Sequence, residues 1–257
     1  FCLSRGLGDV YKRQYGDRDL DLETGLTDRG SDNVPDEIGE RAVEAALALA
    51  DAHGAEVEVL SVGPEASQAS IRKGLAMGAT AAHVVTDDGL IGADLTLTAE
   101  ALAALVRRGE YDLVVAGNIS SDGNGGVIPT MVADHLGWPN LTNLTSVEMD
   151  GQTLTAHRAS DGVDLTLTAE LPAVVSVTEA FPDPRFPNFK GLMAAKKKPL
   201  DVLSLADLDI DAEDFRPARA IMVDATKRPP REAGTVIQDD GTGAEQLAEF
   251  LAQNKLI

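Results

Sequence analysis

The sequence predicts a doubly wound α/β fold, in which helices cover both faces of a mainly parallel sheet. Apolar runs of strand length at 57–63, 81–85 and 112–117 alternate with amphipathic, helix-like segments. The run at 112–117 is continuously apolar, which is typical of a parallel strand buried on both faces. Strands that alternate with helices along a chain favour a parallel sheet with crossover helices.

Capping residues and glycines mark the helical segments. The first helix signal follows Asp32, where Asn33 is a suitable N-cap and Pro35 suits the first turn, and it ends at Gly54. Further helices are expected at 67–77 and 96–108, and a fourth begins near Pro129. These segments supply the connections that parallel strands require.

After Pro139 the pattern changes to antiparallel hairpins. Asp150-Gly151 and Asp161-Gly162 are flanked by alternating residues, which indicates two tight turns. The apolar run 172–178 is then expected to return to the buried sheet. We therefore predict an antiparallel addition to the main sheet.

We divide the chain into three parts. Residues 1–14 lack the acidic character of the rest of the chain, contain no apolar first strand, and resemble a foreign segment. Residues 15–200 are expected to form the nucleotide-binding α/β domain. Residues 201–257 have little periodicity before a helix at 243–253, and are expected to be a C-terminal arm that wraps a partner subunit.

Charge and composition exclude several classes of function. Lys and Arg number 22 against 42 Asp and Glu, a net charge of −20, which argues against nucleic-acid binding and against docking on anionic membranes. No run approaches the roughly 20 apolar residues of a membrane span, so direct membrane insertion is not expected. With one cysteine, no internal disulfide can form. Acid excess together with scarce lysine favours a salt-adapted protein from a halophilic organism; the alternative is an ordinary acidic cytoplasmic protein.

The segment 117–139 contains the clearest candidate site. It follows an apolar strand and leads into a helix, and the carboxyl ends of such strands are where ligands bind in open α/β sheets. Its glycines allow backbone N–H groups to approach a phosphate, although a glycine-rich surface turn is the alternative. The four histidines are scattered, and no nucleophile–base pair stands out. Lys196–Lys198 is either a solvated loop or a contact with an acidic partner or with the subunit that holds a cofactor.

A family resemblance rests on several ordered motifs. The stretch 158–176, then Pro-Arg-Phe at 184–186 and LMAAKKK at 192–198, resembles the signature region of the electron transfer flavoprotein β subunit. IRKGLAMGA at 71–79 and NVPDE at 33–37 agree in order and spacing. The resemblance implies a Rossmann-like domain similar to the adenine-nucleotide α-hydrolases.

The resemblance also implies a function without independent catalysis. Such heterodimers carry electrons from acyl-CoA or other flavin dehydrogenases to a quinone reductase, in the cytoplasm for a chain of this kind. The redox FAD lies mostly on the α subunit and is shared with the β subunit. The β subunit binds AMP, or a second FAD in electron-bifurcating members.

Two sets of residues carry over by position. The resemblance implies nucleotide contacts at Asn33, Val34, Pro35, Asp36, Val62, Gly117, Asn118, Ile119, Ser120, Ser121, Asp122, Gly123, Asn124, Gly125, Gly126, Val127 and Ile128. It implies a partner-recognition loop at Phe186, Pro187, Asn188, Phe189, Lys190, Gly191, Leu192 and Met193, with Phe189 as the apolar anchor. No catalytic residue and no metal ligand are expected.

Two interpretations from other classes compete with the electron carrier. A nucleotide-binding stress or sensor module of similar fold would lack the loop at 181–200 and the long C-terminal arm. An ATP-using ligase or hydrolase would need a catalytic constellation that the sequence does not contain. Within the electron-carrier interpretation, a simple carrier and a bifurcating subunit both remain open.

Overall fold

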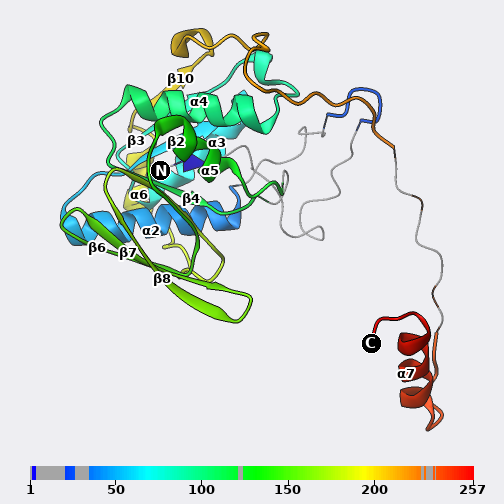
Figure 1. The fold of residues 1–257 in the computed structure, drawn as a ribbon. Helices are drawn as coiled ribbons and strands as arrows, with labels where there is room; N and C mark the ends of the chain where they lie inside the picture. The colour runs from blue at the N-terminus through cyan, green and yellow to red at the C-terminus, as the bar shows by residue number, and fades with distance from the viewer. Residues whose placement is uncertain are drawn as a thin grey trace. The chain divides into compact units, whose positions relative to one another are not determined.

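A computed structural model describes residues 2–3, 21–26, 35–120, 124–226, 229, 234 and 236–257. The chain divides into two compact units, Phe1–Asp224 and Ala225–Ile257. The first unit holds the sheets and is drawn in Figure 1 with its elements labelled. Each unit is described by itself.

Parallel strands form the centre of the first unit. One sheet has the order β1 (Cys2–Leu3), β2 (Glu58–Val62), β3 (Ala81–Val85) and β10 (Leu200–Leu203). A second has the order β4 (Leu113–Gly117), β9 (Ala173–Val177) and β5 (Asn140–Leu144). Every pairing in both is parallel, and β1 lies beside β4, so the two sheets meet there.

Helices cover both faces of these strands, as predicted for a doubly wound fold. Helices α2 (Glu37–His53) and α3 (Gln68–Met77) share one buried core with Val59, Val84 and Val115. Helices α4 (Leu95–Arg108) and α5 (Ile128–Leu136) share the other core with residues of alternate positions on the same strands, such as Leu60 and Val114. Because successive strand residues point to opposite faces, one set of strands supplies both cores.

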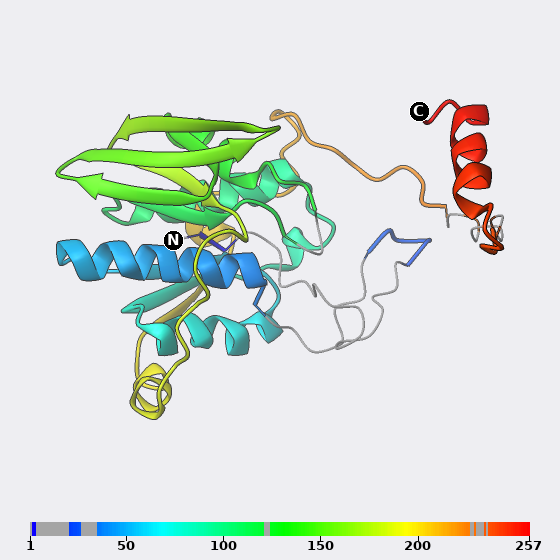
Figure 2. The same cartoon turned by 90° about the horizontal axis from the view of Figure 1, so that it is seen from below.

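The predicted hairpins are confirmed as a separate antiparallel sheet. It contains β6 (Ser146–Asp150), β7 (Thr153–Ser160) and β8 (Val163–Glu170), paired in that order. The β7–β8 turn places Asp161 at φ 50° and Gly162 at φ 78°, the left-handed region that a two-residue hairpin requires. Figure 2 shows this sheet beside α2, and Leu154 and Ala156 bury their side chains in the core that α2 shares.

Some boundaries and elements differ from the sequence expectation. Helix α2 begins at Glu37 with Asp36 as its N-cap, so the predicted cap at Asn33 is wrong. The first fourteen residues do contribute a strand, because the backbone of Cys2–Leu3 pairs with β2. Strands β5 and β10 were not expected. The boundary between compact units lies at 224/225, beyond the expected arm start at residue 201.

Short elements complete the chain. The 3-10 helices are η1 (Glu65–Ser67), η2 (Asp88–Leu90) and η3 (Ala206–Leu208), and α6 (Phe189–Ala195) precedes β10. In the second unit, α7 (Gly243–Gln253) has the predicted bounds. Leu247 and Phe250 lie exposed on α7. The amphipathic pattern of α7 therefore has an apolar side that the unit itself leaves uncovered.

Candidate functional site

The glycine-rich loop begins at the carboxyl end of β4, close to the start of α2. A Cβ built on Gly117 would lie 3.2 Å from the backbone nitrogen of Gly39, in the first turn of α2. This close approach explains a glycine at the end of the strand. Strand order reverses between β1 and β4, and ligands bind at such a switch point in open α/β sheets.

The N-terminus of α2 is already occupied by its own cap. Asp36 Oδ1 accepts hydrogen bonds from the backbone N–H groups of Ile38 (2.9 Å) and Gly39 (3.3 Å), and the residue is only 4% exposed. A second anion is disfavoured there, because the carboxylate already interacts with the positive end of the helix dipole. Asp36 therefore orders the helix, and half-buried Pro35 precedes it. Asn33 and Val34 lie outside the described residues.

The N-terminus of α5 has no such cap. Val127 is its N-cap residue and makes no side-chain hydrogen bond to the first turn, and Pro129 in that turn carries no N–H; among the described residues no other side chain caps this end of the helix. The preceding residues 124–127 are exposed, with Asn124 at φ 48° and Gly126 at φ 65°. The Asn124 N–H donates to Ser120 O at 2.8 Å, closing a turn. Ser121, Asp122 and Gly123 lie outside the described residues.

Asn118 places an amide at the same edge. Its Nδ2 donates to Asn143 Oδ1 at 3.0 Å, while its Oδ1 is buried and has no hydrogen-bond partner among the described residues. Asn143 has φ 56° at an irregularity in β5, and its N–H donates to the buried Ser176 Oγ at 3.0 Å. The irregularity thus fixes the Asn118 amide. An acceptor left in this way stabilises a ligand that brings a donor, such as an amino group.

Not every predicted contact is available through its side chain. Val62 is 3% exposed and packs in the core with Val85, so only its backbone reaches the edge of the sheet. Ile128 is also buried in that core. A Cβ on Gly125 would lie 3.2 Å from Leu95 Cδ1, so the loop rests on the start of α4. Sequence reasoning missed Asn143 and Ser176, whose polarity inside strands was the available signal.

The expected recognition loop is an exposed apolar segment. Phe186 is 96% exposed and Phe189 79% exposed, while Leu192 and Met193 are about half exposed. Asn188 caps α6 by accepting the Gly191 N–H at 2.8 Å. The two phenylalanines of the loop therefore both present their rings to solvent, and Phe186 is more exposed than Phe189, the expected anchor.

Arginines tie the chain before this loop to α2. Arg185 pairs with both carboxylate oxygens of Glu44 (2.9–3.1 Å) and with Asp51 (3.0 Å), and its backbone N–H donates to Glu44 at 2.9 Å. Burial would raise the pKa of Glu44, but the hydrogen bonds and charge of Arg185 outweigh it and hold that pKa below its usual range. Arg41 also contacts Phe181 O and pairs with Asp183 at 2.7 Å.

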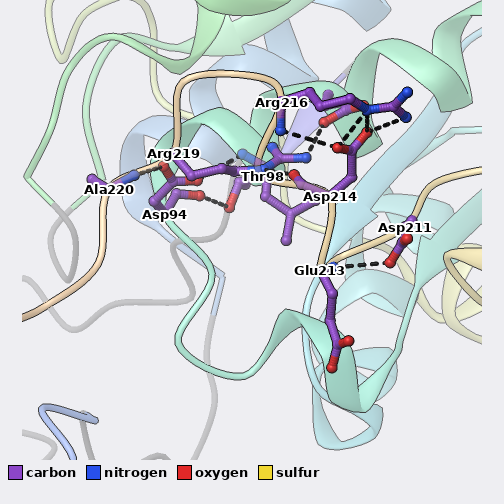
Figure 3. Close-up of polar contacts among 10 residues, drawn as sticks. Asp94, Thr98, Asp211, Glu213, Asp214, Arg216, Arg219 and Ala220 are labelled. Carbon is purple, nitrogen blue, oxygen red and sulfur yellow. Dashed lines mark hydrogen bonds and ion pairs between the residues drawn. The ribbon is translucent and has the colours of Figure 1, made fainter.

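The chain after η3 is fixed to the start of α4 (Figure 3). Asp94 caps α4 through Oδ1, which accepts the Leu97 N–H at 2.8 Å, and its Oδ2 accepts the Ala220 N–H at 2.6 Å. Arg219 is nearly buried and pairs with Glu100 at 2.7 Å. The last part of the first unit is therefore anchored on the helix that also supports the glycine-rich loop.

A second polar cluster lies towards the amino ends of the strands, opposite the glycine-rich loop. Tyr111 donates to Glu58 Oε2, His83 Nε2 lies 3.1 Å from the same oxygen, and His83 Nδ1 lies 3.3 Å from Asp201 Oδ2. Burial, followed by the bond to Glu58, raises the pKa of Tyr111. These contacts connect β2, β3 and β10. Because Glu58 begins β2, the cluster is remote from the loop.

Three further features were sought in the described residues: a metal site, a membrane-spanning helix and a pocket. Among them, no group of three or more His, Cys, Asp or Glu could hold a metal ion. No helix in the described part of the chain has the length and apolar character to cross a membrane. A pocket of about 550 Å³ lies between α2 and β6, lined by residues such as Leu49, Met149 and Phe181, and includes none of the predicted contacts.

Comparison with known proteins decides the family. The electron transfer flavoprotein domain matches residues 24–208. The chain belongs to the electron transfer flavoprotein family. It is 42% identical over 250 residues to the electron transfer flavoprotein subunit beta of Mycobacterium bovis, covering 94% of this chain and 92% of the relative. The same-named proteins of Mycobacterium leprae and Bacillus subtilis are 43% and 33% identical, with at least 90% of each chain covered.

Membership in the electron transfer flavoprotein family confirms the resemblance drawn from the signature motifs. The β-subunit identity makes this chain an electron-transfer component, whose counterpart is an α subunit of the same family.

Proposed function

We propose that this chain is the β half of a heterodimeric electron transfer flavoprotein. It binds an adenine nucleotide at the glycine-rich loop and presents the segment 186–193 to flavin dehydrogenases, from which electrons pass towards a quinone reductase. The FAD, shared with the α subunit, supplies the redox chemistry, and this chain positions it. The open N-terminus of α5 beside the fixed Asn118 amide is the observation that carries the nucleotide assignment.

The described residues fit an adenylate in two respects. The first turn of α5, which no side chain caps among the residues that the structure describes, suits a phosphate together with the exposed residues 124–127. The unpartnered Asn118 Oδ1 suits a donor such as an exocyclic amino group. Side chains of Asp36 and Val62 take no part, because one caps α2 and the other is in the core.

Counting cofactors in the heterodimer tests this assignment. The chain is co-expressed with an α-type subunit, and the purified complex is denatured to release its nucleotides. One FAD and one AMP per heterodimer is the expected result for a simple carrier. Two FAD would instead identify the bifurcating type, and a complex without any adenine nucleotide beyond the shared FAD would contradict the proposed site.

The docking segment is tested by removing its exposed rings. Phe186→Ala and Phe189→Ala are each expected to weaken electron transfer from a dehydrogenase, because aromatic side chains dominate interface energies. Flavin content is expected to stay unchanged, since both rings are exposed and remote from the fold's core. Transfer rates equal to those of the parent protein for both variants would contradict this role.

A further inference from the structure

Lys198 does not behave as a solvated lysine. Its Nζ donates to Leu75 O at 2.8 Å and to Ala79 O at 2.6 Å, at the end of α3, which closes at Met77. Burial lowers the pKa of Lys198. Its neighbours Lys196 and Lys197 are exposed. A cation at the C-terminus of a helix satisfies carbonyls that the helix itself leaves open.

Two further contacts hold α6 against the same end of α3. Arg72, on α3, donates from Nη1 to Ala195 O at 3.0 Å, at the last residue of α6. A Cβ on Gly191 would lie 2.5 Å from Ala76 O, so only glycine allows the two helices to approach so closely. The exposed rings of Phe186 and Phe189 therefore belong to a segment that is fixed at both ends. Arg185 binds Glu44 of α2 at one end, and Lys198 binds Leu75 of α3 at the other.

We propose that Lys198 is a positioning residue for dehydrogenase docking, which fixes α6 on the end of α3 so that the segment 186–193 is presented in one conformation. This rests on the docking role proposed above. A binding segment that is fixed before association loses less conformational entropy on binding. When the competent conformation is only partly populated, apparent affinity falls in proportion to its population.

The competing explanation is that Lys198 acts only through its charge, by attracting an acidic partner. Lys197→Met removes the same single charge from an exposed neighbouring position, so it is the matched control for Lys198→Met. An effect of charge alone is equal in the two variants and weakens as salt rises. An effect of positioning is confined to Lys198→Met and persists in salt.

The test uses the heterodimer with a flavin dehydrogenase of the acyl-CoA class and follows the rate over a range of heterodimer concentration. Lys198→Met is expected to raise the KM for the heterodimer by about tenfold, as when the competent fraction falls to about a tenth, with kcat retained. Lys197→Met changes KM less than twofold. Flavin content and the rate of reduction by dithionite are expected to stay at parental values, and amide exchange across 189–195 to rise in Lys198→Met alone.

Arg72→Met provides the second variant if Lys198→Met does not fold, since it removes the contact to α6 from the α3 side; it is also expected to raise KM. Equal KM values for Lys198→Met and Lys197→Met would overturn the proposal, as would a loss of flavin that accounts for the lower rate. The double variant Phe186→Ala/Phe189→Ala distinguishes the docking role from the positioning role of Lys198. If the double variant raises the KM while Lys198→Met does not, only the positioning role is contradicted. If neither raises KM, the docking role itself fails.

Discussion

Replacing Arg185 by methionine should measurably destabilise the protein. The substitution removes a guanidinium that makes three contacts of 2.9–3.1 Å to Glu44 and one of 3.0 Å to Asp51. The Glu44 side chain is 16% exposed and would keep only the backbone N–H of residue 185. Breaking a fully buried pair costs about 3–5 kcal/mol and an exposed pair about 0–1 kcal/mol.

Because Arg185 is itself 36% exposed, we expect an intermediate loss of about 2 kcal/mol. That corresponds to a fall in Tm of roughly 4–8 °C for a domain of this size. The assay is thermal unfolding followed by circular dichroism at pH 7. The matched control is Arg216→Met, because Arg216 pairs with Asp214 at similar distances (2.7–3.1 Å) but is 90% exposed. An Arg185→Met Tm that matches Arg216→Met would refute the reasoning.

The same pair predicts a pH dependence. Arg185 lowers the pKa of Glu44 below its usual value of 4.5, so the folded state binds this proton less readily than the unfolded chain. The contribution of the pair is therefore fully present above pH 4.5 and is lost as pH falls through the lowered pKa. The Tm difference between the parent protein and Arg185→Met should shrink below pH 4.5. A difference that stays constant from pH 7 to pH 3 would contradict it.

Three other substitutions or conditions give further tests. Asn118→Leu should lower the AMP retained by the heterodimer, because it removes the buried amide oxygen; nucleotide release measured by chromatography decides this, and unchanged retention would contradict it. Arg219→Met should raise amide exchange across 214–222, because it removes the buried bond to Glu100, and unchanged exchange would show that the anchor is unimportant. Raising KCl from 0.1 M to 3 M should raise the Tm, since screening removes repulsion among the charges behind a net −20, and a constant Tm would count against salt adaptation.

Periodicity predicted the regular elements well. The strand at 81–85 and the helix at 243–253 have the predicted bounds, and both hairpin turns were found from their Asp-Gly pairs. Strands β5 and β10 were not predicted from the sequence, because each is short and partly polar and shows no continuous apolar run. The start of α2 was misplaced because Asn33 and Asp36 are both good caps, and side-chain geometry alone distinguishes them.

The candidate site was only partly accessible to sequence reasoning. The glycines and the position after a strand pointed to the loop. The sequence did not show which of Asn33 and Asp36 caps the helix, or that the Val62 side chain faces the core and not a ligand. The bond between Arg185 and Glu44 joins residues 141 positions apart, and that of Lys198 to Leu75 spans 123 positions. Such contacts depend on the tertiary fold. The sequence therefore could not show that Lys198 binds the end of α3 while Lys196 and Lys197 are exposed.

The meeting of β1 and β4 has a mechanical consequence. In the described part of the chain, β1 is two residues long and has its backbone ladder with β2 alone, so no ladder joins the β2 half of the strands to the β4 half. Continuity across this seam rests on α2, which packs against β4 and α3, and on α4, which packs against β2 and α5. Among the described residues, force applied between the halves is therefore borne by the packing of these two helices. A ligand bound over the loop that begins at Gly117 would lie at this seam and would link the two halves.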